Sequence, residues 1–243
     1  MAQPLTNEAA YIEARGLTKS FGTFDALRGI DLAIGKGEFF TLFGPNGAGK
    51  TTFIKLLSTL TKPSTGSLTV AGHDSGKEAD EIRRITGVIS HDPYLYENLS
   101  ALENIKFFGA LYGVTDLDAR AKEVVTAVGL GKRMHDIVRN FSRGMKQRLA
   151  VARATVHEPS ILLLDEPYTG LDQHGAKVFG EMLAALKSRN RTILMTTHNI
   201  DEGLGMSDKV GIIAGGKLVY HGASGDLDGE RFKELYIESV ENV

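Results

Sequence analysis

Short apolar runs recur along the chain, and their length predicts β-strands. We expect strands at residues 30–34, 39–43, 68–71, 87–90, 161–164, 192–196 and 210–214. Four of these runs are nearly all apolar, which is typical of strands covered on both faces in a parallel sheet.

Stretches whose apolar residues recur every three or four positions lie between several of these runs and predict helices. The expected helices are 50–60, 102–112, 118–128, 143–157 and 176–188. The alternation of strands and helices indicates an α/β architecture with right-handed crossovers.

Two parts of the chain depart from this alternation. Residues 92–157 hold three helical segments in a row and no convincing strand, which predicts an inserted helical subdomain. The first 40 residues alternate apolar and polar positions, which favours an antiparallel β subdomain. We expect one domain: residues 1–91 form the β subdomain and the first part of the core, 92–157 the helical subdomain, and 158–243 the second part of the core. Residues 229–243 read as an acidic amphipathic helix or a fraying tail.

Composition excludes several classes of protein. The chain has 243 residues, of which 42% are hydrophobic and 24% charged, so it can bury a substantial core. Its net charge of −2 provides no field to hold phosphate backbones, so we expect no nucleic-acid partner. The absence of cysteine excludes disulfides, iron–sulfur clusters, thiolate zinc sites and a cysteine nucleophile.

No segment of the sequence is typical of a membrane span or a signal peptide. The first residues lack a basic patch followed by an apolar run, and no apolar run approaches the roughly 18–20 residues that cross a bilayer. We therefore expect a soluble, cytoplasmic chain that reaches a membrane only through a partner.

A glycine-rich loop follows the expected strand 39–43. Residues 44–51 read GPNGAGKT, which fits the spacing G-x-x-x-x-G-K-[ST] between a strand and a helix. Glycines let backbone N–H groups surround a phosphate, and the helix that follows directs its positive end at it. Lys50 is expected to reach the β- and γ-phosphates, and the Thr51 hydroxyl to bind Mg²⁺. The alternative is a glycine-rich turn with a surface lysine.

A second candidate site lies at the end of the buried-type strand 161–164. Residues 160–167 read SILLLDEP, and strand alternation sends Asp165 and Glu166 to opposite sides of the sheet edge. One carboxylate is then placed to hold Mg²⁺, and the other to act as a general base on an attacking water. Taken alone, two acids after an apolar run usually mark only a solvated strand end, and it is the glycine-rich loop that favours the metal and base roles.

These motifs and the segment between them resemble the ATP-binding cassette family. Residues 140–154, NFSRGMKQRLAVARA, are similar to its signature segment, although a loop–helix reading alone gives only a Ser142 cap. Gly170, Leu171 and Asp172 follow, and then the strand-terminal His198. The resemblance covers about residues 11–225 and implies a RecA-like P-loop NTPase core that binds ATP and Mg²⁺, with an antiparallel β subdomain and an inserted helical subdomain.

The resemblance implies a role for each matching residue. Glu166, His198 and Lys50 are the expected catalytic residues, with Glu166 as the base and His198 at the γ-phosphate. Ser142 and Gly144 would contact ATP held by a second subunit, and Asp172 would lie at that interface. Thr51, Asp165 and Asp92 are the expected metal ligands. The nucleotide-binding set comprises Phe21, Gly44, Pro45, Asn46, Gly47, Ala48, Gly49, Lys50, Thr51, Thr52, Ser142, Gly144 and Asp172.

Two of these predictions keep an alternative, and the sequence departs from the family's pattern in two places. Phe21 would stack on adenine, or it is an ordinary core residue; His198 would otherwise cap a helix. The glutamine that the family usually places before the helical subdomain is missing, and His91 or Asp92 stands there. The signature has Arg143 and Met145 where glycine and glutamine are frequent.

A single short cassette resembles the separate ATPase subunit of a transporter. Residues 52–60, 62–66 and 94–105 are similar to drug-efflux and haem-exporter cassettes, which favours an exporter. The implied partners are an integral membrane subunit and a second cassette, identical or different. Tyr94, Tyr96, Phe107, Phe108 and Tyr112 would form a groove for the membrane subunit, or pack within the helical subdomain. The alternatives for function are a non-transport cassette, as in DNA repair or translation, and a cassette that hydrolyses ATP weakly.

Overall fold

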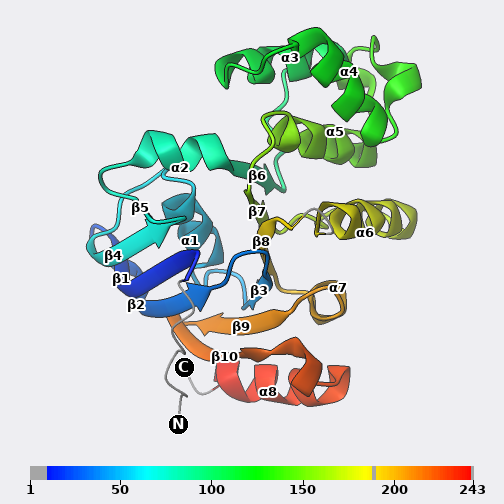
Figure 1. The fold of residues 1–243 in the computed structure, drawn as a ribbon. Coiled ribbons are helices and arrows are strands. Elements are labelled where there is room, and N and C mark those ends of the chain that lie inside the picture. The colour runs from blue at the N-terminus through cyan, green and yellow to red at the C-terminus, as the bar shows by residue number, and fades with distance from the viewer. Residues whose placement is uncertain (1–9, 188–189, 242–243) are drawn as a thin grey trace.

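The computed structural model describes residues 10–187 and 190–241, which form two β-sheets with helices packed around them (Figure 1). The larger sheet has six strands in the order β10-β9-β3-β8-β7-β6. The smaller sheet has four strands in the order β2-β1-β4-β5. The expected α/β fold with a separate antiparallel sheet and a helical region is confirmed.

The six-stranded sheet is parallel except at one edge. Its parallel strands are β3 (Phe39–Phe43), β6 (Thr86–Ser90), β7 (Ile161–Asp165), β8 (Thr192–Thr197) and β9 (Lys209–Ala214), and β10 (Lys217–Ala223) pairs antiparallel with β9. Every residue of β3, β7 and β8 is buried, in agreement with the apolar runs that predicted them. Because the strands are parallel, the segments that follow β3, β7 and β8 emerge at one sheet edge.

The four-stranded sheet contains the N-terminal part of the described chain. It consists of β1 (Ile12–Phe21), β2 (Phe24–Ile34), β4 (Thr65–Val70) and β5 (His73–Asp74) in antiparallel pairs. Helix α1 (Lys50–Leu57) lies between the two sheets (Figure 1), and Phe53, Ile54 and Leu57 join both of them in one core cluster.

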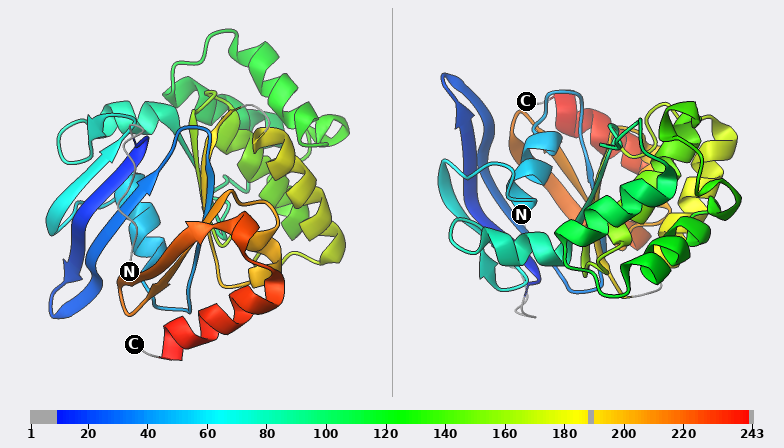
Figure 2. Two further views of the ribbon diagram at one scale, coloured as in Figure 1. Left: turned by 60° about the horizontal axis from the view of Figure 1, so that its bottom comes forward. Right: turned by 90° about the horizontal axis from the view of Figure 1, so that it is seen from above.

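Helix α2 (Ala79–Ile85) lies on the α1 side, next to β5, and its Ile82 joins the same core cluster as α1 (Figure 1). The remaining helices gather on the other side of the larger sheet and at the two ends of the molecule (Figures 1 and 2). They are α3 (Ala101–Leu111), α4 (Leu117–Ala127), α5 (Arg143–Thr155), α6 (Gln173–Lys187), α7 (Ile200–Leu204) and α8 (Gly229–Glu241). Helices α3, α4 and α5 lie together at one end, and α8 covers β9 and β10 at the opposite end. Strand alternation in β7 divides the core: Ile161 and Leu163 face the α1 side, and Leu162 and Leu164 face α5 and α6.

Several element boundaries differ from the sequence expectation. The helix expected over 50–60 ends at Leu57, and Thr59 adopts a left-handed φ of 59°, which closes the helix. The helix expected from 176 begins at Gln173. Three parts of the chain on which these expectations fall lie outside the described residues. They are the expected end of this helix at residue 188, the N-terminal stretch 1–9, and residues 242–243 of the expected C-terminal segment.

The contact between α5 and β6 gives a pH prediction. His157 Nε2 lies 3.2 Å from the Thr86 carbonyl oxygen, and the imidazole stacks on Tyr112 with ring centroids 3.7 Å apart. Burial lowers the pKa of His157 to about 4. Between pH 6.5 and 4 the unfolded chain therefore binds a proton that the folded chain does not, and the free energy of unfolding falls as pH drops.

Discounted for partial exposure, the expected loss is on the order of 2 kcal/mol between pH 7 and pH 4. Urea unfolding of the wild type and of His157→Gln across this range measures it, because the variant lacks the titrating group. The His157 variant is expected to lose less stability on acidification. Equal losses in both proteins would exclude His157 as the source.

Candidate functional site

The glycine-rich loop, residues 44–51, connects β3 to α1 at the carboxyl edge of the six-stranded sheet. Gly47 and Gly49 adopt left-handed φ values of 80° and 111°, and Gly49 caps the N-terminus of α1. A Cβ atom on Gly49 would lie 2.6 Å from the carbonyl oxygen of Ala26, so only glycine fits there. The loop therefore directs backbone N–H groups and the positive end of α1 toward one point.

Lys50 is the buried cation of this loop, with a relative exposure of 5%. Its Nζ donates to the Gly44 carbonyl at 2.6 Å and to the Pro45 carbonyl at 3.1 Å. The same Nζ lies 3.1 Å from Oε1 of Glu166, an ion pair whose angles do not make a hydrogen bond. In this state the ammonium is held by the loop and by the acid after β7.

Glu166 joins the lysine to the histidine after β8. Its side chain is 17% exposed, and its Oε2 lies 2.9 Å from Nδ1 of His198. The backbone at Glu166 has a φ of 49°, a left-handed conformation that is rare outside glycine and that is found at functional sites. The structure thus brings Lys50, Glu166 and His198 into one charged cluster, although they are far apart in sequence.

Asp165 lies beside this cluster and is almost fully buried. Its Oδ1 accepts a hydrogen bond from Thr51 Oγ1 at 3.2 Å and one from Thr196 Oγ1 at 2.7 Å. The Thr196 hydroxyl also lies within 3.3 Å of the backbone N–H of Glu166. Thr196 was missed in the sequence, because nothing in a buried strand distinguishes a threonine that orients a neighbouring carboxylate.

Phe21 is exposed at the end of β1. Its relative exposure is 51%, which contradicts the alternative that it is a core residue. The ammonium of Lys19 lies 4.9 Å from the ring centroid, over one face. An exposed aromatic face with a cation beside it provides a stacking surface for a planar base.

The signature residues lie on a different surface from the lysine cluster. Ser142 caps the N-terminus of α5, where its Oγ accepts from the Met145 N–H at 3.3 Å, and Gly144 faces open space. Asp172 caps α6 through a 2.7 Å bond from the Gly175 N–H. A hollow of about 320 Å³ is lined by Ser142, Gly144 and Asp172, and by no residue of the glycine-rich loop. Within one chain, these residues are therefore not brought to Lys50.

His91 and Asp92 follow β6, and both are exposed. Asp92 Oδ1 accepts from the Tyr94 N–H at 3.2 Å, and its backbone carbonyl accepts from Ser90 Oγ at 2.5 Å. Ser90 is paired with Asp165 in the sheet, so this loop begins at the same edge as the candidate metal ligands. Within residues 10–187 and 190–241, no group of three His, Asp or Glu side chains forms a ready-made metal site.

Three of the aromatic residues after β6, namely Tyr96, Phe107 and Phe108, form one cluster, whereas Tyr112 stacks on His157. Tyr96 contacts Phe107 edge-on with centroids 4.9 Å apart, and Phe107 contacts Phe108 at 5.3 Å. Tyr94, Tyr96, Phe107 and Tyr112 are each at least 40% exposed. Phe108 is only partly exposed, and the guanidinium of Arg153 lies 5.2 Å from the centroid of its ring. These side chains therefore form an exposed apolar surface on the helical region.

Two titratable groups on the last part of the chain lie near the charged cluster. Burial raises the pKa of Glu202 in α7, and the charge of His198 opposes that rise. Burial and then the charge of Glu166 raise the pKa of Tyr236 in α8. No sequence signal placed Tyr236 on the same side of the molecule as Glu166, since this depends on how α8 packs over β9.

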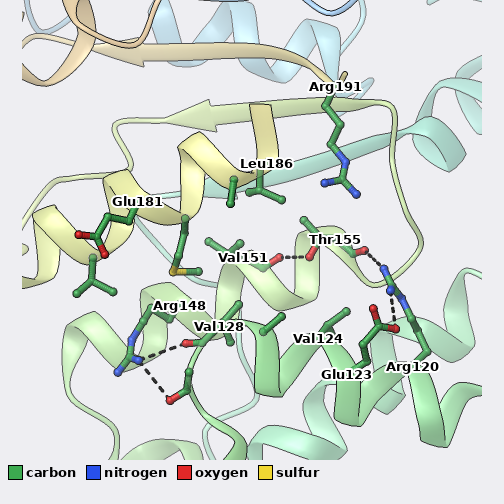
Figure 3. A pocket seen from close by; sticks show the side chains of 15 residues that line it. Arg120, Glu123, Val124, Val128, Arg148, Val151, Thr155, Glu181, Leu186 and Arg191 are labelled. Carbon is green, nitrogen blue, oxygen red and sulfur yellow. Dashed lines mark hydrogen bonds and ion pairs between the residues drawn. The ribbon is translucent and has the colours of Figure 1, made fainter. Parts of the chain in front are cut away.

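Another hollow, of about 420 Å³, lies between α4, α5 and α6 (Figure 3). Aliphatic side chains line it together with Arg120, Arg148 and Arg191. Arg148 donates to the carbonyl oxygens of Val128 and Gly129 at 3.2 and 3.5 Å. None of the expected nucleotide-binding residues lines this hollow.

Among the described residues, no helix is both long enough and apolar enough to span a bilayer.

The family model for ABC transporters matches residues 27–169. The ABC transporter ATP-binding protein NatA of Bacillus subtilis is 38% identical over 214 residues, which are 86% of this chain and 87% of NatA. The Nod factor export ATP-binding protein I of Cupriavidus pinatubonensis is 35% identical over 226 residues, which are 92% of this chain and 70% of that protein.

A solved structure shows the same fold as a dimer. It is the dimeric post-hydrolysis state of the ATP-binding cassette MJ0796 bound to ADP and Pi. The TM-score is 0.79 at 25% sequence identity, and the match covers 88% of this chain and 98% of that one.

Proposed function

This chain belongs to the ABC transporter family as its ATP-binding, ATP-hydrolysing subunit, and we propose that the transporter it serves is an exporter. The observation that carries the ATPase role is the cluster of Lys50, Glu166 and His198 at one sheet edge, with the signature residues lining a separate hollow of the same chain. Export is supported by the likeness of residues 52–66 and 94–105 to efflux cassettes and by the Nod factor export relative.

We propose the following roles for the nucleotide-binding residues. Residues 44–52 surround the ATP phosphates, and Phe21 stacks on the adenine. The Lys50 ammonium exchanges Glu166 for the β- and γ-phosphate oxygens, because a polyphosphate offers it more negative charge. Glu166 is then free to take a proton from the attacking water, and His198 donates a hydrogen bond toward the γ-phosphate.

Mg²⁺ fits the donor atoms at this edge. Thr51 and Asp165 present a hydroxyl and a carboxylate whose oxygens lie 3.2 Å apart, and oxygen is the donor that Mg²⁺ prefers. Sites of this kind use one or two protein ligands and complete the shell with phosphate and water, so a three-carboxylate cluster is not required. We propose Thr51 and Asp165 as ligands, and Asp92 as a further oxygen donor. When bound, the ion neutralises charge on the transferred phosphoryl group.

A second copy of the cassette, identical or different, completes each ATP site. Ser142 caps α5 and is exposed, and a Cβ atom added at Gly144 would meet nothing within 4 Å, so this end of the helix is open in the single chain. We propose that they contact the γ-phosphate of ATP held by the facing subunit, and that Asp172 lies at the same interface. The positive N-terminal end of α5 then stabilises negative charge on the γ-phosphate oxygens that Lys50 does not contact.

We propose that the aromatic cluster on the helical region receives a cytoplasmic helix of an integral membrane subunit. Exposed aromatic side chains grouped on one surface are typical of protein interfaces. The chain would then lie at the inner face of the cell membrane, attached through that subunit. No nucleic-acid partner is proposed.

An efflux assay tests the direction of transport. The chain is co-expressed with the membrane subunit that co-purifies with it, and cells are loaded with a panel of fluorescent amphipathic drugs. Wild-type cells are expected to retain less of at least one compound than cells expressing Glu166→Gln. A Tyr96→Asp variant is expected to keep the ATPase activity of the isolated chain but to lose co-purification with the membrane subunit.

Three outcomes would contradict the proposal. Higher retention in wild-type cells would indicate import. Salt-sensitive binding of nucleic acid without a membrane subunit would favour a non-transport cassette. Equal ATP turnover in wild type and Glu166→Gln would favour a cassette that hydrolyses ATP weakly.

A further inference from the structure

The first residue of α5 is an arginine at a helix end where a positive charge is disfavoured. Arg143 directs its side chain away from the helix axis and donates from Nε and Nη2 to a single acceptor, the Thr169 carbonyl oxygen, at 3.0 and 2.7 Å. Within residues 10–187 and 190–241, no carboxylate lies within ion-pair distance of it. The guanidinium therefore links the signature to the backbone that follows Glu166.

The neighbouring glycine makes room for this contact. Gly170 has a left-handed φ of 74°, and a Cβ atom built on it would lie 2.5 Å from Nε and 2.6 Å from Cζ of Arg143. The guanidinium thus packs directly on the Gly170 backbone. Any larger residue at position 170 would displace the arginine.

A second side chain of α5 holds the same segment. Gln147 lies one turn beyond Arg143 on the same helix face, and its Nε2 donates to the Pro167 carbonyl at 3.0 Å. The segment begins at Glu166, whose carbonyl accepts from the Thr169 N–H at 3.2 Å, and ends at Asp172. Helix α5 therefore holds two carbonyls of the loop that joins the catalytic acid to the interface aspartate.

We propose that Arg143 is a positioning residue that couples the two ATP sites of the dimer. The inference rests on the proposed function, in which Ser142 and Gly144 contact the partner's ATP while Glu166 serves the chain's own ATP. A movement of the α5 N-terminus when the partner's nucleotide arrives is transmitted by Arg143 to the Thr169 carbonyl, and from there to Glu166. A glycine at position 143 has no side chain with which to make this link.

ATPase activity measured against ATP concentration tests the coupling. Arg143→Ala is expected to lower kcat about tenfold, because a charge-assisted hydrogen bond is lost. It is also expected to shift the Hill coefficient toward one and to leave KM nearly unchanged. Arg143→Lys keeps the charge but not the two-donor geometry, so it is expected to restore only part of the cooperativity.

Arg120→Ala is the matched control. Arg120 also donates to two backbone carbonyls, those of Val156 and Thr155 at 3.0 and 3.1 Å, but these lie at the opposite end of α5, and Arg120 does not line the hollow that holds Ser142 and Gly144. Its removal is expected to leave the Hill coefficient unchanged. Gly170→Ala is expected to reproduce the loss seen in Arg143→Ala, and the double variant to be no worse than either single variant.

Each outcome decides the inference. Wild-type cooperativity in Arg143→Ala, or equal losses in Arg143→Ala and Arg120→Ala, overturns it while the proposed function stands. If the thermal midpoint of Arg143→Ala falls so far that unfolding at the assay temperature accounts for the loss of kcat, the inference is also overturned, since the role of Arg143 is then structural. A wild-type chain that hydrolyses no ATP overturns both the inference and the proposed function.

Discussion

Replacing Glu166 by glutamine is expected to lower kcat for ATP hydrolysis by about 10²- to 10⁴-fold, the range for losing a general base. Glutamine has nearly the same shape, but its amide cannot take a proton from water. Glu166 touches both Lys50 Nζ and His198 Nδ1, at 3.1 and 2.9 Å, so the acid is held beside the other expected catalytic groups. ATP affinity is expected to be retained.

Phosphate release from saturating ATP measures this effect. Glu202→Gln is the matched control, because Glu202 lies in α7 close to His198, whereas the acid that pairs with Lys50 is Glu166. Its kcat is expected to stay within a few-fold of wild type. Comparable losses in the two variants would exclude a specific role for Glu166 as the base.

Replacing Lys50 by methionine is expected to raise the Kd for ATP by about 10²- to 10³-fold, because a buried cation can gain two or more charge-assisted contacts to phosphate. Methionine keeps the length and the apolar stem of lysine but not its charge. In the nucleotide-free chain, the substitution also leaves Glu166 Oε1 without its cationic partner. A loss of stability is therefore expected along with the loss of affinity.

Titration with a fluorescent ATP analogue measures the affinity of each variant. Lys55→Met is the control, since Lys55 is an exposed residue of the same helix one turn further on. Its affinity is expected to match wild type. If Lys50→Met also binds ATP at wild-type affinity, the glycine-rich loop is not the phosphate site.

The parts of the fold that could be predicted from sequence are those with local signals. Strand β3 was predicted with its observed bounds, because a nearly apolar run of five residues directly before a glycine-rich loop is typical of a buried parallel strand. Strand β10 was missed since its residues alternate between intermediate and exposed, with none buried. Helix α2 was missed because it buries Ile82 alone, so no apolar stripe marks it.

In the candidate site, too, the residues that belong to local sequence motifs could be predicted and the contacts between distant segments could not. Lys50, Thr51 and Asp165 carry motif spacing, and the parallel sheet then explains why they lie together. The contacts of Arg143 with Thr169 and of Thr196 with Asp165 join segments with no common motif. They depend on strand order and on the packing of α5, which local sequence patterns do not encode.

Light scattering of the Glu166→Gln protein tests the central claim most directly, namely that two copies enclose ATP between Lys50 of one and Ser142 of the other. The protein is expected to be monomeric without nucleotide and dimeric with Mg²⁺ and ATP. Adding Ser142→Arg to the same protein is expected to keep it monomeric while ATP still binds. A Glu166→Gln protein that binds ATP and remains a monomer, or a dimer that survives Ser142→Arg, would contradict the account.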